Sequence, residues 1–144
     1  MALPPLLALA DEQAYRSHFE NTYCQGPIST FDGFAVRFRK DQFDHCCYES
    51  NRRTRVKETF STVRATRLDW IKAALQDPHA SLYVGWDNER KCYAQDRRVC
   101  VVSGNYVVVI SLIRDKEARF ITAFLADTPR TIQRIHGSPG WKRA

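Results

Sequence analysis

Hydrophobic positions along this chain repeat with a helical period in the first half and with a strand-like period in the second. Residues 11–23 carry an aromatic residue at every fourth position, which is typical of a short amphipathic helix. The Gly-Pro pair at 26–27 is expected to close that helix. The repeating positions are Tyr15, Phe19 and Tyr23.

Two further helices are predicted before the pattern changes. The first covers residues 41–48, with Asp41 at its start and Phe43, Cys46 and Cys47 on its buried side. The second runs from Phe60 or Thr62 to Gln76 and ends at an Asp-Pro pair. A short strand is expected at 34–38, and the polar, arginine-rich stretch 49–58 is interpreted as a mobile basic loop.

The second half of the chain reads as β structure. The predicted strands are 82–86, 98–102, 106–113 and 119–125, and one or two helical turns follow at 129–136. Helices followed by hairpin-linked strands predict an α+β fold, with the N-terminal helices packed on one face of a roughly four-stranded antiparallel sheet. We expect residues 1–30 to form an arm and a short helix, and 31–144 to form a single compact domain.

Composition and charge narrow the function classes. The 144 residues are 44% hydrophobic, and no apolar run reaches the ~20 residues that a membrane-spanning helix needs. A net charge of +6 favours acidic partners, with nucleic acid first. The five cysteines lack zinc-site spacing, which favours buried thiols in a reducing cytosol. The first ten residues lack the basic start of a secretory signal, so we expect a cytoplasmic protein with no membrane association.

Two arginines lie within the apolar face predicted for the helix that ends at Gln76. Arg64 and Arg67 project into the middle of that face, where an unpaired guanidinium is costly. The interpretation of Arg64 is open: it forms an ion pair with a carboxylate such as Asp44 or Glu49, it extends its charged end to the rim, or it forms an anion site that suits the planar fork of arginine. Arg67 is interpreted as structural or peripheral. The face itself comprises Phe60, Val63, Leu68, Trp70, Ile71, Ala74 and Leu75.

A histidine and a threonine are the other candidates for chemistry. His45 is predicted on the helix side opposite the buried cysteines, and its near-neutral titration suits it to accept or donate a proton. An ordinary, partly exposed histidine is the alternative. On strand 119–125, alternation places Thr122 between Phe120 and Phe124 on one face, where its hydroxyl could position a phosphate oxygen. A plain strand threonine is the alternative there.

Several catalytic motifs are missing from the chain. It contains no phosphate-binding glycine loop, no H-E-x-x-H and no paired carboxylates suited to magnesium. If the protein cleaves nucleic acid, we therefore expect it to use no metal and no cofactor. RNA permits this because its 2′-hydroxyl is an internal nucleophile. Candidate contacts to the RNA backbone are Arg39, Lys40, Arg67 and Arg98.

The order of these motifs resembles a known superfamily. Phe-Asp-His45, Arg64-Ala, Leu-Tyr-Val-Gly-Trp86 and Phe-Ile-Thr122-Ala-Phe follow one another as in phage and toxin-type nucleases of the barnase–EndoU–colicin–RelE superfamily. The similarity spans roughly residues 30 to 141. It implies a metal-independent endoribonuclease that leaves a 2′,3′-cyclic phosphate, and many members are held by a protein antidote.

The sequence thus predicts a small α+β ribonuclease whose partner is RNA, with an antidote or immunity protein as a further possible partner. His45 is assigned to proton transfer, Arg64 to charge stabilisation and Thr122 to phosphate orientation. The rival interpretation is a non-catalytic RNA-binding module or a protein-partner adaptor on the same scaffold.

Overall fold

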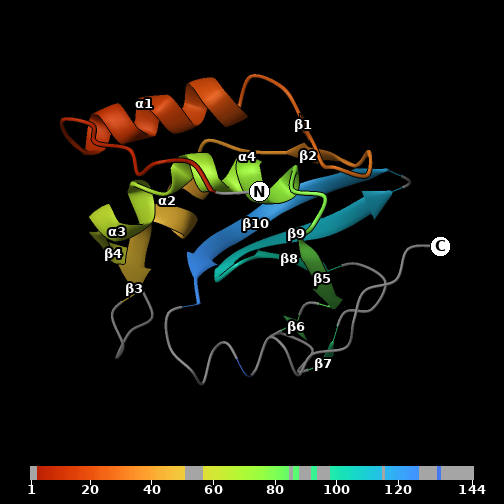
Figure 1. Ribbon diagram of the computed structural model, residues 1–144. Coiled ribbons are helices and arrows are strands. Elements are labelled where there is room, and N and C mark those ends of the chain that lie inside the picture. Colours follow the sequence, from red (N-terminus) through yellow and green to blue (C-terminus); the bar gives the residue numbers. More distant parts are fainter. Residues whose placement is uncertain are drawn as a thin grey trace.

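A computed structural model of the protein describes residues 3–50, 57–84, 86–87, 92–93, 98–114, 116–126 and 133. Figure 1 shows helices gathered on one side of a central sheet. The helices of this part of the chain are α1 (Glu12–Tyr23), α2 (Gln42–Cys47), α3 (Thr62–Ala65) and α4 (Leu68–Leu75). Its strands are β1 (Ile28–Ser29), β2 (Ala35–Arg37), β3 (Tyr48–Ser50), β4 (Lys57–Phe60), β5 (Ser81–Val84), β6 (Trp86–Asp87), β7 (Cys92–Tyr93), β8 (Arg98–Ser103), β9 (Tyr106–Arg114) and β10 (Glu117–Leu125).

The α+β class is confirmed, but the sheet is larger and more varied than predicted. Six strands pair in the order β1-β2-β10-β9-β8-β5. The four strands expected from the sequence correspond to β5, β8, β9 and β10, and they form one antiparallel block. The predicted strand at 34–38 forms as β2 and adds to β10 in parallel, so the sheet is mixed. A three-residue strand carries no sequence signal for its partner or direction, because both are set by tertiary contacts.

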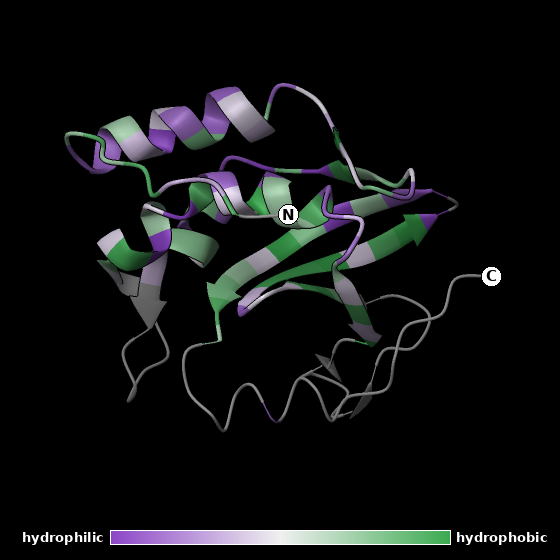
Figure 2. Ribbon diagram, in the orientation of Figure 1, coloured by the Kyte–Doolittle hydropathy of each residue, from purple (hydrophilic) through white to green (hydrophobic). Residues whose placement is uncertain are grey.

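The helices form two layers over the sheet. α2 packs against β10, and α4 packs against β8 and β9. α1 lies above these two helices and covers them (Figure 1). Figure 2 shows hydrophobic residues concentrated in the central strands, whereas much of α1 is hydrophilic. The aromatic stripe of α1 packs against Phe38, which follows β2, Phe43 of α2 and Phe60 of β4.

The N-terminal segment shares the core of the rest of the chain. Tyr15, Phe19 and Tyr23 are at most 4% exposed and belong to the same hydrophobic cluster as Phe43 and Phe120. The extended arm before α1 docks on the surface, where the indole nitrogen of Trp70 donates to the carbonyl of Pro4 at 2.6 Å and Leu7 N donates to Thr66 O at 2.8 Å.

The prediction of one continuous helix from Phe60 or Thr62 to Gln76 is wrong in its continuity: Thr62–Ala65 and Leu68–Leu75 are helical, but residues 66–67 separate them. Residues 57–60 form β4, and two helices follow with a break between them. Ser61 caps α3 by accepting a hydrogen bond from Arg64 N at 3.2 Å, and Arg67 has φ −104° and ψ 15°, which interrupts the helix. Val63 is consequently 58% exposed rather than buried, because the break turns α3 away from the face that α4 presents to the core.

The opposite face of the sheet carries a second, smaller apolar cluster. It consists of Val102, Val107, Val109 and Ala126, with Tyr83, Cys100, Ile121 and Phe124 packed against it. Its residues alternate along β8 and β9 with those of the main core, as expected for strands that bury side chains on both faces.

Some sequence predictions fall beyond these residues. Residues 51–56 of the predicted basic loop 49–58 lie outside the described part, but the loop prediction is wrong at both ends, because 49–50 belong to β3 and 57–58 to β4, and these strands pair. Of residues 129–136 only Gln133 is described, and it is helical. The predicted strand 82–86 is described as β5 followed, after residue 85, by β6. No helix in the described ranges is long and apolar enough to cross a membrane.

Tyr23 joins α1 to α4, so its hydroxyl is expected to matter for stability. It donates to Leu68 O at 2.5 Å and accepts from Lys72 N at 3.0 Å in a fully buried position. Replacing Tyr23 by Phe leaves both backbone groups without this partner, so the free energy of unfolding should fall by about 1–3 kcal/mol. Tyr15→Phe is the matched control, because its hydroxyl bonds only the half-buried arm, and it should cost less. Urea denaturation of the two variants measures the difference, and equal losses would contradict this account.

We expect the contribution of the buried Asp77 carboxylate to the free energy of unfolding to depend on pH. The carboxylate accepts from Ser103 Oγ at 2.7 Å and from His79 N at 2.9 Å, and these bonds lower the pKa of Asp77 below its ordinary value of 3.8. Its stabilising effect should be complete above pH 3.8 and be lost as the pH falls through the lowered folded value. We expect Asp77→Asn to be less stable than wild type at pH 6 and the gap to close towards pH 3. A gap of constant size in denaturation curves across this range would contradict the assignment.

Candidate functional site

Helix α2 is the centre of the candidate site because it meets most of the segments that carry the candidate residues. It carries His45 and packs against β10, α3 and β4. As predicted, its inward side is apolar: Phe43 and Cys47 are fully buried and Cys46 is 3% exposed. Asp41 precedes the helix but its side chain makes no capping bond, because the carboxylate pairs with Arg39 at 3.3 Å instead.

The first residue of α2 attaches the helix to β10. The side-chain amide of Gln42, 6% exposed, donates to the carbonyl oxygen of Phe120 and accepts from Arg39 N at 2.8 Å. Phe120 directly precedes a β-bulge, since Phe120 pairs with Ile110 while Thr122 already pairs with Val109. A bulge interrupts the ladder of backbone hydrogen bonds locally. Gln42 supplies a partner at this interruption and fixes α2 beside it.

The last residue of α2 attaches the helix to the segment that carries Arg64. Ser61 N donates to Cys47 O at 2.7 Å, and Ser61 Oγ accepts from Arg64 N at 3.2 Å. Arg64 therefore lies one capping residue away from the end of α2, and its side chain is half-buried. Figure 1 places α3 and the β3–β4 pair near the end of the sheet toward which β10 runs. Because the two anchors, Gln42 and Cys47, are five residues apart, about 7.5 Å of helix separates them, and His45 lies between them.

The charge of Arg64 affects the pKa of the Cys47 thiol, which lies at this anchor. The sulfur atoms of Cys46 and Cys47 are 3.6 Å apart. A hydrogen bond with Cys46 and burial raise the pKa of the Cys47 thiol, while the positive charges of Arg64 and Arg16 act in the opposite direction. The Cys47 thiol is thus neutral and unreactive at neutral pH, and the guanidinium of Arg64 lies close enough to α2 to act on this thiol electrostatically.

The outward side of α2 is neutralised by α1. Arg16 donates to Asp44 at 2.9 Å and to Glu12 at 3.5 Å, and its guanidinium carbon lies 4.4 Å from the centre of the Phe43 ring. Asp44 was one of the two carboxylates that the ion-pair interpretation of Arg64 required. Its partner among the described residues is Arg16. The side chains of Glu49, the other carboxylate, and of His45 lie outside the described part of the chain.

Arg67 has the structural character expected of it. Its Nη1 donates to Val63 O at 2.6 Å, and its guanidinium carbon lies 5.0 Å from the centre of the Trp70 ring. Its Nε is buried without a hydrogen-bond partner in the described part of the chain. These contacts hold the guanidinium across the break between α3 and α4, and a role in binding RNA stays a prediction.

The predicted surroundings of Thr122 are wrong, because the bulge changes which face its side chain occupies. Phe120 belongs to the core under the helices, whereas Phe124 packs on the opposite face. Thr122 pairs with Val109, which is also on that opposite face, and side chains of paired residues share a face. The bulge adds one residue between Phe120 and Thr122, and strict alternation fails there. Thr122 therefore lies next to the α2 contact on β10 but on the sheet face away from the helices.

The remaining basic candidates are spread over the surface. Arg39 and Lys40 are exposed just before α2 and have acidic neighbours, Asp41 at 3.3 Å and Glu20 at 3.9 Å. Arg98 begins β8 opposite Ser111 of β9, and its side chain is outside the described part. The structure thus brings the segments of His45 and Arg64 together at α2. It places Thr122 beside α2 along β10 but on the other face of the sheet, and it leaves Arg98 on another strand.

Sequence reasoning missed Gln42, although a signal for it was present. Gln42 lies four residues before the buried Cys46, so the two share one face of the helix. A polar residue on a buried helix face indicates a specific hydrogen-bond partner. In the described ranges, no group of three or more His, Cys, Asp or Glu side chains could hold a metal ion. The expectation of metal independence stays a prediction.

Loss of the Gln42 amide should weaken the attachment of α2 to the bulge. We expect Gln42→Ala to lower the free energy of unfolding by about 1–3 kcal/mol, because Phe120 O would be buried without this donor. Gln76→Ala is the matched control: its amide also donates to a backbone carbonyl, Ser29 O at 3.2 Å, but at an exposed site. The control should change stability by less than about 0.5 kcal/mol in the same denaturation assay. Similar effects of the two substitutions would contradict the role given to Gln42.

Comparison of the chain with protein-family models, with curated proteins and with solved structures found no match.

Proposed function

We propose that this protein is a metal-independent endoribonuclease that cleaves RNA by attack of the 2′-hydroxyl on the adjacent phosphorus, leaving a 2′,3′-cyclic phosphate. The observation that carries the proposal is the position of α2. This helix bears His45, meets the capped turn of Arg64 at one end, and is bonded next to the bulge of Thr122 at the other.

The chemistry requires few groups from the protein. The nucleophile belongs to the substrate, so the enzyme must align it, move two protons and offset the negative charge that builds on the phosphoryl oxygens. We assign proton transfer to His45, since imidazole titrates near neutral pH. Arg64 is assigned to the phosphoryl oxygens, because its planar fork donates two parallel hydrogen bonds to a phosphate.

Thr122 is assigned to orientation of the phosphate from the sheet. Its place beside the bulge sets it next to the strand segment that Gln42 bonds, and its hydroxyl faces away from the helix layer. The RNA would then approach over that sheet face and place the scissile bond at the end of the sheet near α2 and α3. Backbone contacts are assigned to Arg39, Lys40, Arg67 and Arg98, and the net charge of +6 supports a polyanionic substrate.

Two further proposals come with the resemblance rather than from the geometry. The protein would act on RNA in the cytoplasm, where a freely active ribonuclease is toxic. An antidote protein would then be needed, and an acidic partner would be complementary to the basic surface.

A cleavage assay with single-residue variants tests the proposal. Labelled RNA is incubated with the purified protein in EDTA, and the new ends are analysed for a 2′,3′-cyclic phosphate. Wild type should cleave, while His45→Ala and Arg64→Ala should each lose about 10²- to 10⁴-fold in rate with an unchanged circular dichroism spectrum. Arg64→Lys keeps the charge but not the fork and should retain intermediate activity.

The matched control for His45 is His79→Ala, since His79 is exposed and only its backbone amide makes a hydrogen bond in the described part. This control should cleave like wild type. Full activity of both His45→Ala and Arg64→Ala would remove the catalytic assignments. RNA that is retarded but intact in the presence of wild type would favour the rival binding module.

A further inference from the structure

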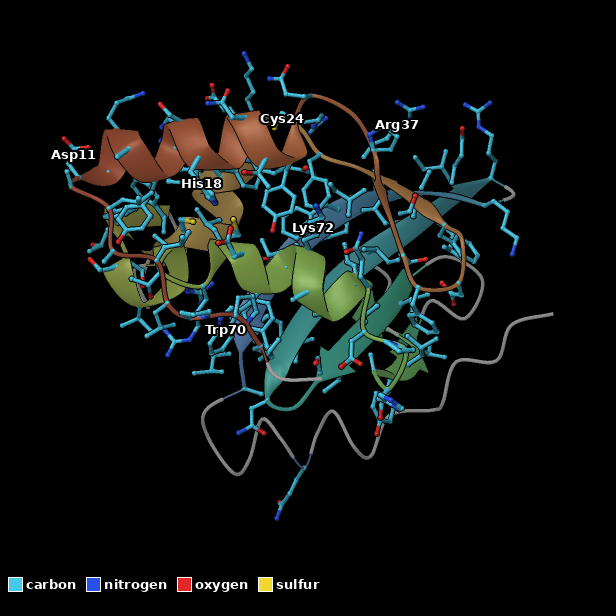
Figure 3. All side chains as sticks on the ribbon, turned by 45° about the horizontal axis from the view of Figure 1, so that its top comes forward. Asp11, His18, Cys24, Arg37, Trp70 and Lys72 are labelled. Atoms are coloured by element: carbon cyan, nitrogen blue, oxygen red, sulfur yellow. The ribbon has the colours of Figure 1, made fainter. Side chains whose placement is uncertain are left out.

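Two arginines lie side by side where β2 joins the sheet. The parallel pairing of β2 with β10 places Arg37 directly beside Arg119. Both side chains are exposed, and Figure 3 shows Arg37 at the strand that forms this join. Adjacent strands are about 4.8 Å apart, so the two Cα atoms are close neighbours. Neither arginine stood out in the sequence, because 82 positions separate them.

Both arginines point to the sheet face away from the helices. The residues on either side of Arg119, Ala118 and Phe120, are buried in the helix-side core, so Arg119 projects to the other face. Val36 is buried in the same core and leaves Arg37 on the same side as Arg119. Thr122 shares this face three residues further along β10, about 10 Å from Arg119 along the strand.

The row continues across the sheet. Arg119 pairs with Ser111 of β9, and Ser111 pairs with Arg98 of β8. We call Arg37, Arg119, Ser111 and the Arg98 position the arginine row. It crosses four neighbouring strands in a line roughly perpendicular to them, over about 14 Å.

The arginines of this row differ from nearby cations in their partners within the protein. Arg114 pairs with Glu117 at 2.8 Å, and Lys116 lies 5.0 Å from the centre of the Phe34 ring. By contrast, none of the carboxylates in the described ranges pairs with Arg37 or Arg119. Like charges at directly adjacent strand positions repel one another and destabilise a sheet. An anion bound between them would relieve that repulsion.

We infer that the arginine row binds consecutive phosphates of single-stranded RNA and guides the strand toward Thr122. This inference rests on the proposed function and adds two substrate contacts, Arg37 and Arg119, that the proposed function does not include. Cations on neighbouring strands suit an extended polyanion, because Arg37 of β2 and Arg119 of β10 each supply one charge on the same line across the sheet. Two guanidiniums on adjacent strands, about 4.8 Å apart, can contact neighbouring phosphates of one backbone.

Binding of an uncleavable strand tests the inference independently of catalysis. A fluorescent 2′-O-methyl oligoribonucleotide has no free 2′-hydroxyl, so it is not cleaved by the proposed route. Its dissociation constant is measured by anisotropy between 50 and 200 mM salt for the full-length protein. Removing two phosphate contacts in Arg37→Gln/Arg119→Gln should make the slope of log K against log salt shallower by about 1.4, and weaken binding by about 25-fold at 0.1 M salt.

A variant of equal charge provides the control. Lys72→Gln/Arg114→Gln also removes two positive charges, but Lys72 lies on α4 on the helix side and Arg114 is already paired with Glu117. Its slope should match wild type. The melting temperature of Arg37→Gln/Arg119→Gln should not fall, since the substitution removes a repulsion rather than a packed contact.

The outcomes separate this inference from the proposed function. Active wild type with an unchanged slope in the arginine-row variant would overturn the inference and leave the ribonuclease proposal standing. A shallower slope in a protein that cleaves nothing would support the row and refute the ribonuclease. Equal slope changes in both double variants would overturn the inference about the arginine row. The inference would also be overturned if Arg37→Gln/Arg119→Gln lost binding to phosphatidylserine vesicles but bound the oligonucleotide as wild type does.

Discussion

The attachment of α2 is the constraint on which the candidate site depends. An isolated helix of six residues is not stable in water, because nucleation costs more than so few hydrogen bonds return. Tertiary contacts must therefore hold it: Gln42 bonds β10, Cys47 O accepts from Ser61, and Arg16 of α1 neutralises Asp44. Each contact holds a different part of the helix: its first residue, its last residue and its outward side. Together they determine where the backbone of His45 lies relative to Arg64.

The bulge at Ile121 links this helix to the other face of the sheet. It interrupts the pairing of β10 with β9 next to the carbonyl that Gln42 binds, and it moves Thr122 to the face opposite Phe120. One extra residue thus gives β10 two adjacent roles. One side of the strand supports the core beneath α2, and the other presents a hydroxyl on the surface that also carries Arg119.

The arginines of the described ranges fall into two groups: some are paired with other protein groups and stabilise the fold, and others have no such partner. Arg16 stabilises α2 through carboxylates, and Arg67 is held by a carbonyl and an indole ring. The charges of Arg37 and Arg119 have no such partners in the described ranges and share the face away from the helices. If the protein cleaves RNA, proton transfer at α2 and binding along the arginine row would use groups from different parts of the fold, with Thr122 on the face that carries the row.

The sequence by itself determined the helix α1, the burial of Cys46 and Cys47, and the antiparallel strands β5, β8, β9 and β10. Periodicity alone specifies such elements, because each residue's burial follows its neighbours at fixed spacing. The sequence could not reveal the break at Arg67 or the bulge beside Thr122, where one residue departs from the period. Nor could it place β2 beside β10 or Gln42 against Phe120, 78 positions away. Only tertiary structure decided these contacts, because their partners are distant in the chain and leave no local pattern.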